Sequence, residues 1–268
     1  MSTKSFDGVA DTLFIPLAAR VAASTRFPEY FCDKKSLELA DIDAVRRINA
    51  KSNEYTMLAS TSRYYCIDRF ATAFIQKNKE CGIICLGVGL ETMNYRVTGA
   101  GVHYYQVDFP SVIENRSKVL GKAENETLIG CDITDMRWTE QVDKEKPIML
   151  IASGVFQYFK EEAVLKFISD MKKIFSGAEL VFDATNEVGI RYAQKYVKKT
   201  GNTSAIMYFF INDAAAFAEQ VGVRLLESRG FYKEAREMIG KKTGLYTRIA
   251  MKVADDKKRT ILISVKLI

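Results

Sequence analysis

Two closely spaced glycines, Gly87 and Gly89, follow an apolar run in the stretch CLGVGLETMNYR, which covers residues 85–96. Glycine lets a backbone come close to a ligand, and a glycine loop after a buried strand is a common place for a nucleotide. The loop therefore has three candidate ligands, namely a dinucleotide, a nucleotide phosphate and S-adenosylmethionine. A structural turn that binds nothing is the alternative to all three.

Polar residues also stop the next four apolar runs of the chain, and these are Asp108, Asp132, Ser153 with Gly154, and Asp183. A single polar residue of this kind is an ordinary helix cap. Several in succession favour a binding site, because ligands of open α/β sheets bind beyond the carboxyl ends of the strands. We therefore expect these residues and the glycine loop at one rim of a sheet.

Short apolar runs that alternate with helical stretches predict the sheet itself, as a doubly wound α/β fold with mostly parallel strands. The predicted strands cover about 83–86, 104–107, 127–130, 148–152, 179–182, 224–227 and 260–267, and the last one, ILISVKLI, is expected to run antiparallel. Helices are predicted between them at 111–120, 161–174 and 213–221. The segment 230–258 is expected to be of mixed structure.

The first 78 residues follow a different pattern. Apolar residues recur there at three- and four-residue intervals, which predicts helices at about 11–24, 36–49 and 62–76. We expect residues 1–78 to form a helical cover packed on a sheet domain at 79–268, in which about 184–211 is an inserted segment. No repeat or low-complexity linker divides the chain.

Composition narrows the class of protein. At 268 residues, 48% hydrophobic and 27% charged, the chain suits one large globular domain or one domain with an appendage. Its net charge of +6 is spread over scattered basic pairs, so we expect no nucleic-acid-binding face. Five cysteines without a CxxC pair indicate thiols in a reducing cytoplasm, with neither disulfides nor a metal site. We expect no signal peptide and no membrane span.

Individual positions separate the candidate ligands. A phosphate-binding loop needs a lysine after its glycines, and the loop has none. A dinucleotide loop needs a third small residue where this chain has Thr92. Asp108 suits ribose hydroxyls, while Asp132 and Ile133 suit the amino group and the ring of adenine. S-adenosylmethionine has a ribose and an adenine but no pyrophosphate, so this set favours it over the dinucleotide of an NAD-linked oxidoreductase.

Several sequence blocks follow one another in a definite order. They are the stretch from Asp11 to Arg20, Arg63 with Asp68, LGVGLETMNYR, YYQVDFPSVIENR from Tyr104, CDITDMRW from Cys131 and SGVFQYF from Ser153. The set, over about residues 11–232, resembles the leucine carboxyl methyltransferase family, which also includes methyltransferases for carboxyl groups of polyketides. The resemblance implies a Rossmann-like class I S-adenosylmethionine-dependent methyltransferase fold, with a seven-stranded sheet and an N-terminal helical cover.

The resemblance also implies roles for individual residues. Arg63 would hold the carboxylate of the methionine part of the cofactor, and Asp108 would hold its ribose. Asp132 and Ile133 would contact the adenine side. Arg20 would be the N-terminal basic residue that also meets the cofactor.

Two positions depart from the family pattern. Met93 stands where the family has an arginine, although Arg96 keeps the second arginine, and Ser153 stands where the family has a glutamate that meets the methionine end. Loss of that carboxylate removes a charged hydrogen bond worth roughly 1.5–3 kcal/mol, for which Glu91 could compensate. The alternative hypothesis is a degenerate protein that binds S-adenosylmethionine or S-adenosylhomocysteine without transferring the methyl group.

The expected chemistry is methyl transfer from a sulfonium, which requires alignment of the reacting atoms and exclusion of water. A carboxylate acceptor is already ionised at neutral pH, whereas a hydroxyl needs a base. His103, the only histidine, precedes the second strand and so lies at the opposite end from the site. Tyr158 is our candidate catalytic residue, with Asp183 as a second helper for a hydroxyl. The alternative is that Tyr158 packs in an aromatic cluster with Phe156 and Phe159.

The segment 184–211 follows the fifth strand at the site end and interleaves tyrosines with cations. We expect it to form the acceptor pocket with the N-terminal helices, where Arg191 or Tyr192 would hold an anionic acceptor beside Phe156 and Tyr158. The alternative is an exposed helix with solvated charges. The stretch SGVFQYF lacks the proline-rich turn of nucleic-acid amino methyltransferases. The sequence thus predicts an O-methyltransferase that acts on a carboxylate of a small molecule or a peptide end.

Overall fold

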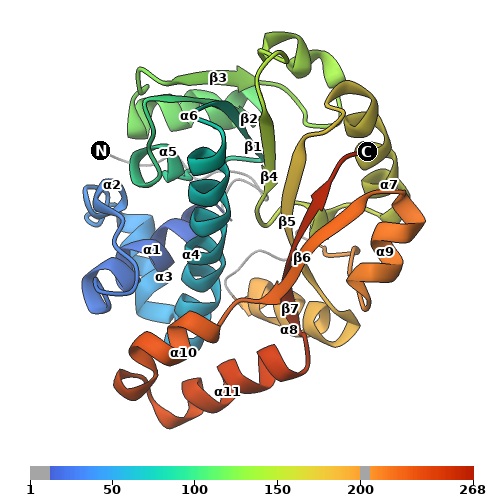
Figure 1. The fold of residues 1–268 in the computed structure, drawn as a ribbon. Helices are drawn as coiled ribbons and strands as arrows, with labels where there is room; N and C mark the ends of the chain where they lie inside the picture. Colours follow the sequence, from blue (N-terminus) through green and yellow to red (C-terminus); the bar gives the residue numbers. More distant parts are fainter. Residues whose placement is uncertain (1–12, 200–205) are drawn as a thin grey trace.

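A seven-stranded sheet forms the centre of the computed structural model, which describes residues 13–199 and 206–268 (Figure 1). The strands follow the spatial order β3-β2-β1-β4-β5-β7-β6. Their bounds are β1 Glu80–Leu86, β2 Gly101–Asp108, β3 Glu126–Gly130, β4 Ile148–Ala152, β5 Glu179–Thr185, β6 Arg224–Gly230 and β7 Thr260–Lys266. Every predicted strand is present, and several are longer than predicted because pairing continues into polar ends such as Glu80 opposite Gly101.

The sheet is parallel except at β7. Strand β1 pairs with β2 and β4, β2 pairs with β3, and β4 pairs with β5, all parallel, whereas β7 lies antiparallel between β5 and β6. This confirms the predicted mostly parallel sheet with an antiparallel last strand. As a consequence β7 begins at Thr260, opposite Thr185, where β5 ends. The rim made by the carboxyl ends of the parallel strands therefore also holds the residues just before β7.

Four helices precede the sheet, namely α1 Phe14–Arg26, α2 Lys34–Leu37, α3 Asp43–Lys51 and α4 Glu54–Lys77. The helix predicted at 36–49 is divided in two, because the Asp33 side chain caps α2 and a new helix starts at Asp43. Helix α4 begins earlier than predicted, since Asn53 and Thr56 form a reciprocal capping box at its start. The first two residues of the helix predicted at 11–24 lie outside the described residues.

The remaining helices connect the strands. They are α5 Met93–Arg96, α6 Pro110–Leu120, α7 Glu161–Ile174, α8 Glu187–Lys199, α9 Ala214–Val221, α10 Lys233–Ile239 and α11 Leu245–Asp256, with 3₁₀ turns at η2 Met136–Gln141, η3 Phe156–Tyr158 and η4 Gly240–Lys242. The segment expected to be mixed, 230–258, thus forms two helices. Both contact α4, and Figure 1 shows them beside the N-terminal helices, so the cover is built from both ends of the chain.

Apolar layers cover both faces of the sheet. Because neighbouring strand residues point to opposite faces, Ile83 packs with α1, α4 and α10 while Ile84 packs with α7 and α9. Helix α4 contacts β1, β5 and β7, so the helical front shares its core with the sheet. Within the described ranges, no helix is long and apolar enough to cross a membrane.

Candidate functional site

The glycine loop after β1 is held by the acid that ends β2. Gly87 and Gly89 have φ angles of 57° and 51°, a left-handed conformation that glycine adopts without strain. The Gly89 amide donates to Oδ2 of Asp108 over 2.8 Å, and the Phe109 amide donates to Oδ1 over 2.8 Å. A carboxylate has about four acceptor positions, so each oxygen of Asp108 keeps one for a ribose hydroxyl.

A cavity of about 780 Å³ opens at this rim. Its volume lies within the range of roughly 300–1,000 Å³ that is usual for small-molecule sites. The cofactor end of the cavity is lined by the glycine loop, Asp108, Phe109, Cys131, Ile133 and Ser153. The acceptor end lies over β5 and β7, where α4, α8 and α11 contribute the wall, with Tyr55, Tyr192, Tyr232, Tyr246 and Arg259.

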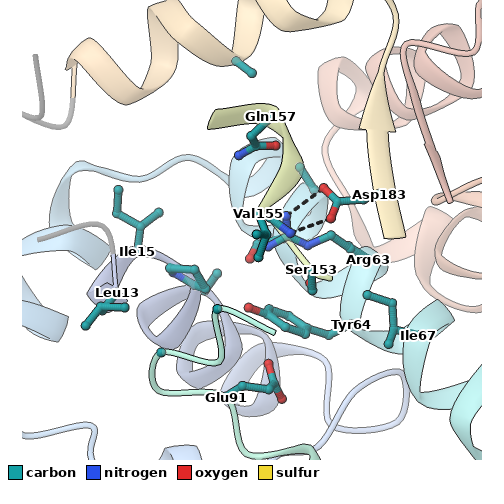
Figure 2. Close-up of a pocket in the computed structure, with 18 of the residues that line it drawn as sticks. Leu13, Ile15, Arg63, Tyr64, Ile67, Glu91, Ser153, Val155, Gln157 and Asp183 are labelled. Atoms are coloured by element: carbon teal, nitrogen blue, oxygen red, sulfur yellow. Dashed lines mark hydrogen bonds and ion pairs between the residues drawn. The ribbon is translucent and has the colours of Figure 1, made fainter. Parts of the chain in front are cut away.

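Arg63 of α4 and Asp183 of β5 form an ion pair between these two ends (Figure 2). Nη1 of Arg63 donates to Oδ2 of Asp183 over 3.1 Å, and the Gly154 amide donates to Oδ1 over 2.5 Å. Burial would lower the pKa of Arg63, but Asp183 raises it above its ordinary value. Nε of Arg63 and Oγ of Ser153 are buried and have no hydrogen-bond partner within the described part of the chain. These two atoms are therefore free to bind a polar ligand group.

A buried charge network joins the helical cover to the glycine loop. Arg96 donates to Asp33, Asp68 and Glu91 over 2.9, 2.8 and 2.7 Å, and Arg20 also contacts Asp33 and Glu91, over 3.0 and 3.3 Å. Burial would raise the pKa of Glu91, but Arg96 and Arg20 lower it below its ordinary value. Both arginines and Glu91 are thus charged parts of one structural unit.

This network explains why the chain has Thr92 and Met93 at these two positions. The Thr92 hydroxyl donates to Oδ2 of Asp33 over 2.5 Å, which accounts for a hydroxyl residue where a dinucleotide loop needs a small one. Met93 is buried in the apolar core, and Arg96 alone reaches all three carboxylates of the network. The loop is therefore held although Met93 replaces the arginine of the family, which weakens the argument for a degenerate protein.

Most of the predicted site residues come together around the cavity. Its lining includes Arg20, Arg63, Gly87, Gly89, Glu91, Asp108, Ile133, Ser153, Tyr158 and Tyr192. Figure 2 shows Arg63, Ser153 and Asp183 near one another at this cavity. The lining residues named above come from α1, α4, α8 and the carboxyl ends of β1 to β4 with the segments that follow them, so most of them lie at the rim where ligands of such sheets bind.

Three predicted residues do not line this cavity. Asp132 is exposed, and its Oδ1 accepts from the amide and the hydroxyl of Thr134. Phe156 is only 2% exposed, because it packs in the core between Phe167 and Phe182. Arg191 has a side chain that is 71% exposed and pairs with Glu187 one helical turn away. The structure therefore supports the core interpretation for Phe156 and the solvated one for Arg191.

Tyr158 lines the cavity, whereas His103 lies away from it. Tyr158 lies in η3 after β4, lines the cavity, and has its pKa raised by burial, so its phenol stays protonated at neutral pH. In this state it can donate a hydrogen bond. His103 lies within the start of β2, where its Nε2 contacts the Thr127 hydroxyl at 2.8 Å, remote from the rim as expected.

Sequence reasoning missed the C-terminal part of the acceptor end. Tyr246 and Ala250 of α11, together with Arg259 and Thr260, line the cavity. A signal for Arg259 was present, because the antiparallel strand that follows it must begin at the rim where the parallel strands end. No such signal exists for α11, whose position depends on its packing against α4.

The donor set fits S-adenosylmethionine. The unpartnered Nε of Arg63 and Oγ of Ser153 match the polar amino-acid end of that molecule. Asp108 has acceptor positions left for the ribose, and Ile133 supplies an apolar surface for the base. Within the described residues, no group of three or more histidine, cysteine, aspartate or glutamate side chains is placed to hold a metal ion.

Comparison with known proteins agrees with this description. The sequence model of the leucine carboxyl methyltransferase family matches residues 11–172. The tetracenomycin polyketide synthesis O-methyltransferase TcmP of Streptomyces glaucescens is 25% identical over 225 residues, which cover 82% of each chain. A DUF574 family protein of Streptomyces avermitilis has a similar fold, with a TM-score of 0.60, 11% identity and coverage of 93% of this chain and 96% of that one. Magnesium protoporphyrin IX methyltransferase of Synechocystis, solved with bound S-adenosylhomocysteine, has a TM-score of 0.50, 12% identity and coverage of 87% and 99%.

The sheet order, the glycine loop after β1 and the acid that ends β2 define a class I methyltransferase that uses S-adenosylmethionine. The family match extends over more than half of the sequence. The chain belongs to the leucine carboxyl methyltransferase family and is an S-adenosylmethionine-dependent O-methyltransferase.

Proposed function

We propose that this enzyme methylates a carboxylate of a small molecule or a peptide end. The observation that carries the proposal is the engagement of both oxygens of Asp183, by Arg63 and by the Gly154 amide. Asp183 thus already accepts from two donors beside the acceptor end of the cavity. A hydroxyl acceptor would need a base there, whereas a carboxylic acid, with a pKa near 4, is ionised without one.

The other two acidic groups of the described cavity wall also have partners other than the acceptor. Asp108 accepts from two backbone amides, and Glu91 lies between Arg20 and Arg96. Tyr158 stays protonated because burial raises its pKa. This wall suits an acceptor that arrives as an anion.

The residues divide into binding and positioning roles. We assign Arg63 and Ser153 to the amino-acid end of the cofactor, Asp108 to the ribose and Ile133 to the adenine ring. When bound, S-adenosylmethionine supplies an electrophilic methyl group. Tyr158, which lines the cavity after β4, orients the acceptor by donating a hydrogen bond, and the apolar wall excludes water from the reacting atoms. The name of TcmP, an O-methyltransferase of polyketide synthesis, supports a small-molecule acceptor over a peptide end.

A labelling experiment tests the acceptor group directly. The enzyme is incubated with methyl-labelled S-adenosylmethionine and a panel of aromatic acids, their matching alcohols and phenols, and short peptides with free ends. Alkali releases the methyl group of an ester as methanol but leaves an ether intact. We expect label that alkali releases, and a product set stable to alkali would show that a hydroxyl is methylated instead.

A further inference from the structure

Arg259 is a cation at the acceptor end that has no counterion among the described residues. It precedes β7, is half-buried and lines the cavity. The two other arginines of the cavity wall are paired, Arg20 with Asp33 and Glu91, and Arg63 with Asp183. Throughout residues 13–199 and 206–268, no carboxylate lies within ion-pair distance of Arg259. An unpaired cation that lines a cavity is available to a bound anion.

The backbone of Arg259 is held firmly in place. Its carbonyl accepts from the Asn186 amide over 3.3 Å, and a Cβ at Gly189 would collide with the same carbonyl. The next residue, Thr260, pairs with Thr185 across the strands. Helix α8 and strand β5 therefore determine the place from which the Arg259 side chain extends.

The guanidinium group stacks on an aromatic ring. Its Cζ lies 5.2 Å from the ring centroid of Tyr192 in α8. This contact does not neutralise the guanidinium, whose N–H donors match the two oxygens of a carboxylate. Arg259 thus keeps a positive charge that can attract an anion.

The wall around Arg259 is rich in aromatic side chains. It includes Tyr55, Tyr232 and Tyr246, and the Tyr55 and Tyr232 rings stack with centroids 5.8 Å apart. One unpaired cation suits a singly charged group, whereas a phosphate would need more than one. Flat tyrosine faces favour a planar, apolar skeleton next to that charge.

We propose that Arg259 binds the carboxylate of the methyl acceptor, and that Tyr55 and Tyr192 select an acceptor whose carboxylate is attached to an aromatic ring. The proposal rests on the proposed carboxyl methylation. It assigns to Arg259, which follows α11, the role for which the sequence suggested Arg191 or Tyr192.

Binding of two matched probes to the complex with S-adenosylhomocysteine tests the proposal by calorimetry. The probes are 2-naphthoate and the neutral 2-naphthalenemethanol. We expect wild-type enzyme to bind the acid at least about tenfold more tightly than the alcohol. In Arg259→Gln this preference should disappear, Arg259→Lys should restore part of it, and the affinity for S-adenosylhomocysteine should not change. Arg248→Gln, on the exposed face of α11, is the matched control and should behave as wild type.

The possible results separate this proposal from the proposed function. No binding of 2-naphthoate by wild type, or an equal effect of the Arg259 and Arg248 substitutions, would overturn the role of Arg259. An alkali-stable product from an acceptor whose binding needs Arg259 would overturn carboxyl methylation alone. Tyr192→Leu provides a further check, because it should weaken binding of both probes if the ring contributes packing.

Discussion

The Gly89 amide and the Asp108 carboxylate are joined by a hydrogen bond of 2.8 Å, so the end of β2 holds the loop that follows β1. The two residues are 19 positions apart, and their strands lie side by side in the sheet. Any change at Asp108 therefore acts on the ribose contact and on the shape of the glycine loop together.

Asp108→Asn should weaken the binding of S-adenosylhomocysteine by roughly ten- to a hundredfold, in line with the loss of a charged hydrogen bond. An asparagine amide would place a donor against the Gly89 or Phe109 amide, which now donates to the carboxylate. Calorimetric titration measures the affinity. Asp170→Asn, which removes only an exposed pair with Lys166, is the control, and equal affinities of the two variants would contradict the role of Asp108.

Arg63→Gln should weaken binding of S-adenosylhomocysteine but leave binding of adenosine nearly unchanged. The reason is that adenosine lacks the amino-acid end that we assign to Arg63. The variant also leaves the buried Asp183 carboxylate without its counterion, so a stability loss of up to about 3–5 kcal/mol is expected. A parallel loss of affinity for both ligands would show that Arg63 acts only through folding.

Acid should remove part of the stability that Asp33 contributes. Burial would raise the pKa of this carboxyl, but Arg96 and Arg20 lower it from 3.8 to about 2 in the folded protein. A pKa that is lowered by folding stabilises the native state above the unfolded pKa, and this contribution, roughly 2 kcal/mol, is lost as the pH falls through 2. We expect the difference in unfolding free energy between wild type and Asp33→Asn to shrink between pH 4 and pH 2. Urea unfolding at each pH measures it, and a constant difference would refute the assignment.

Tyr158→Phe should lower kcat by about three- to tenfold, the effect of losing one neutral hydrogen bond. The shape of the pH–rate profile between about pH 6 and 9 should not change, because the raised pKa keeps the phenol protonated across that range. Loss of a limb of the profile would instead identify Tyr158 as a base. Phe156→Leu serves as the comparison, because replacing this core ring should lower the stability of the protein and leave the shape of the pH–rate profile unchanged.

Local sequence patterns were sufficient to predict the strands and the residues at one side of the site. Alternating apolar runs located each strand, and the residues that end β2, β4 and β5, namely Asp108, Ser153 and Asp183, lie around one cavity as expected. This prediction succeeded because parallel strands place all their carboxyl ends at one rim, so residues that follow different strands lie close together. Helix boundaries were less well predicted, because side-chain caps such as Asp33 and Asn53 decide where α2 and α4 begin.

Contacts between distant segments depended on the tertiary structure. Arg63 and Asp183 are 120 positions apart, and no local pattern shows that they pair or that Arg63 retains a free Nε. Phe156 and Arg191 have residue types that fit a site. Phe156 is nevertheless buried in the core, and Arg191 forms an ion pair at the surface. Arg259 lies at the acceptor end because β7 runs antiparallel beside β5. The sequence therefore specifies which side chains are available, but the packing of α4, α8 and β7 decides which of them are paired and which are left to bind a ligand.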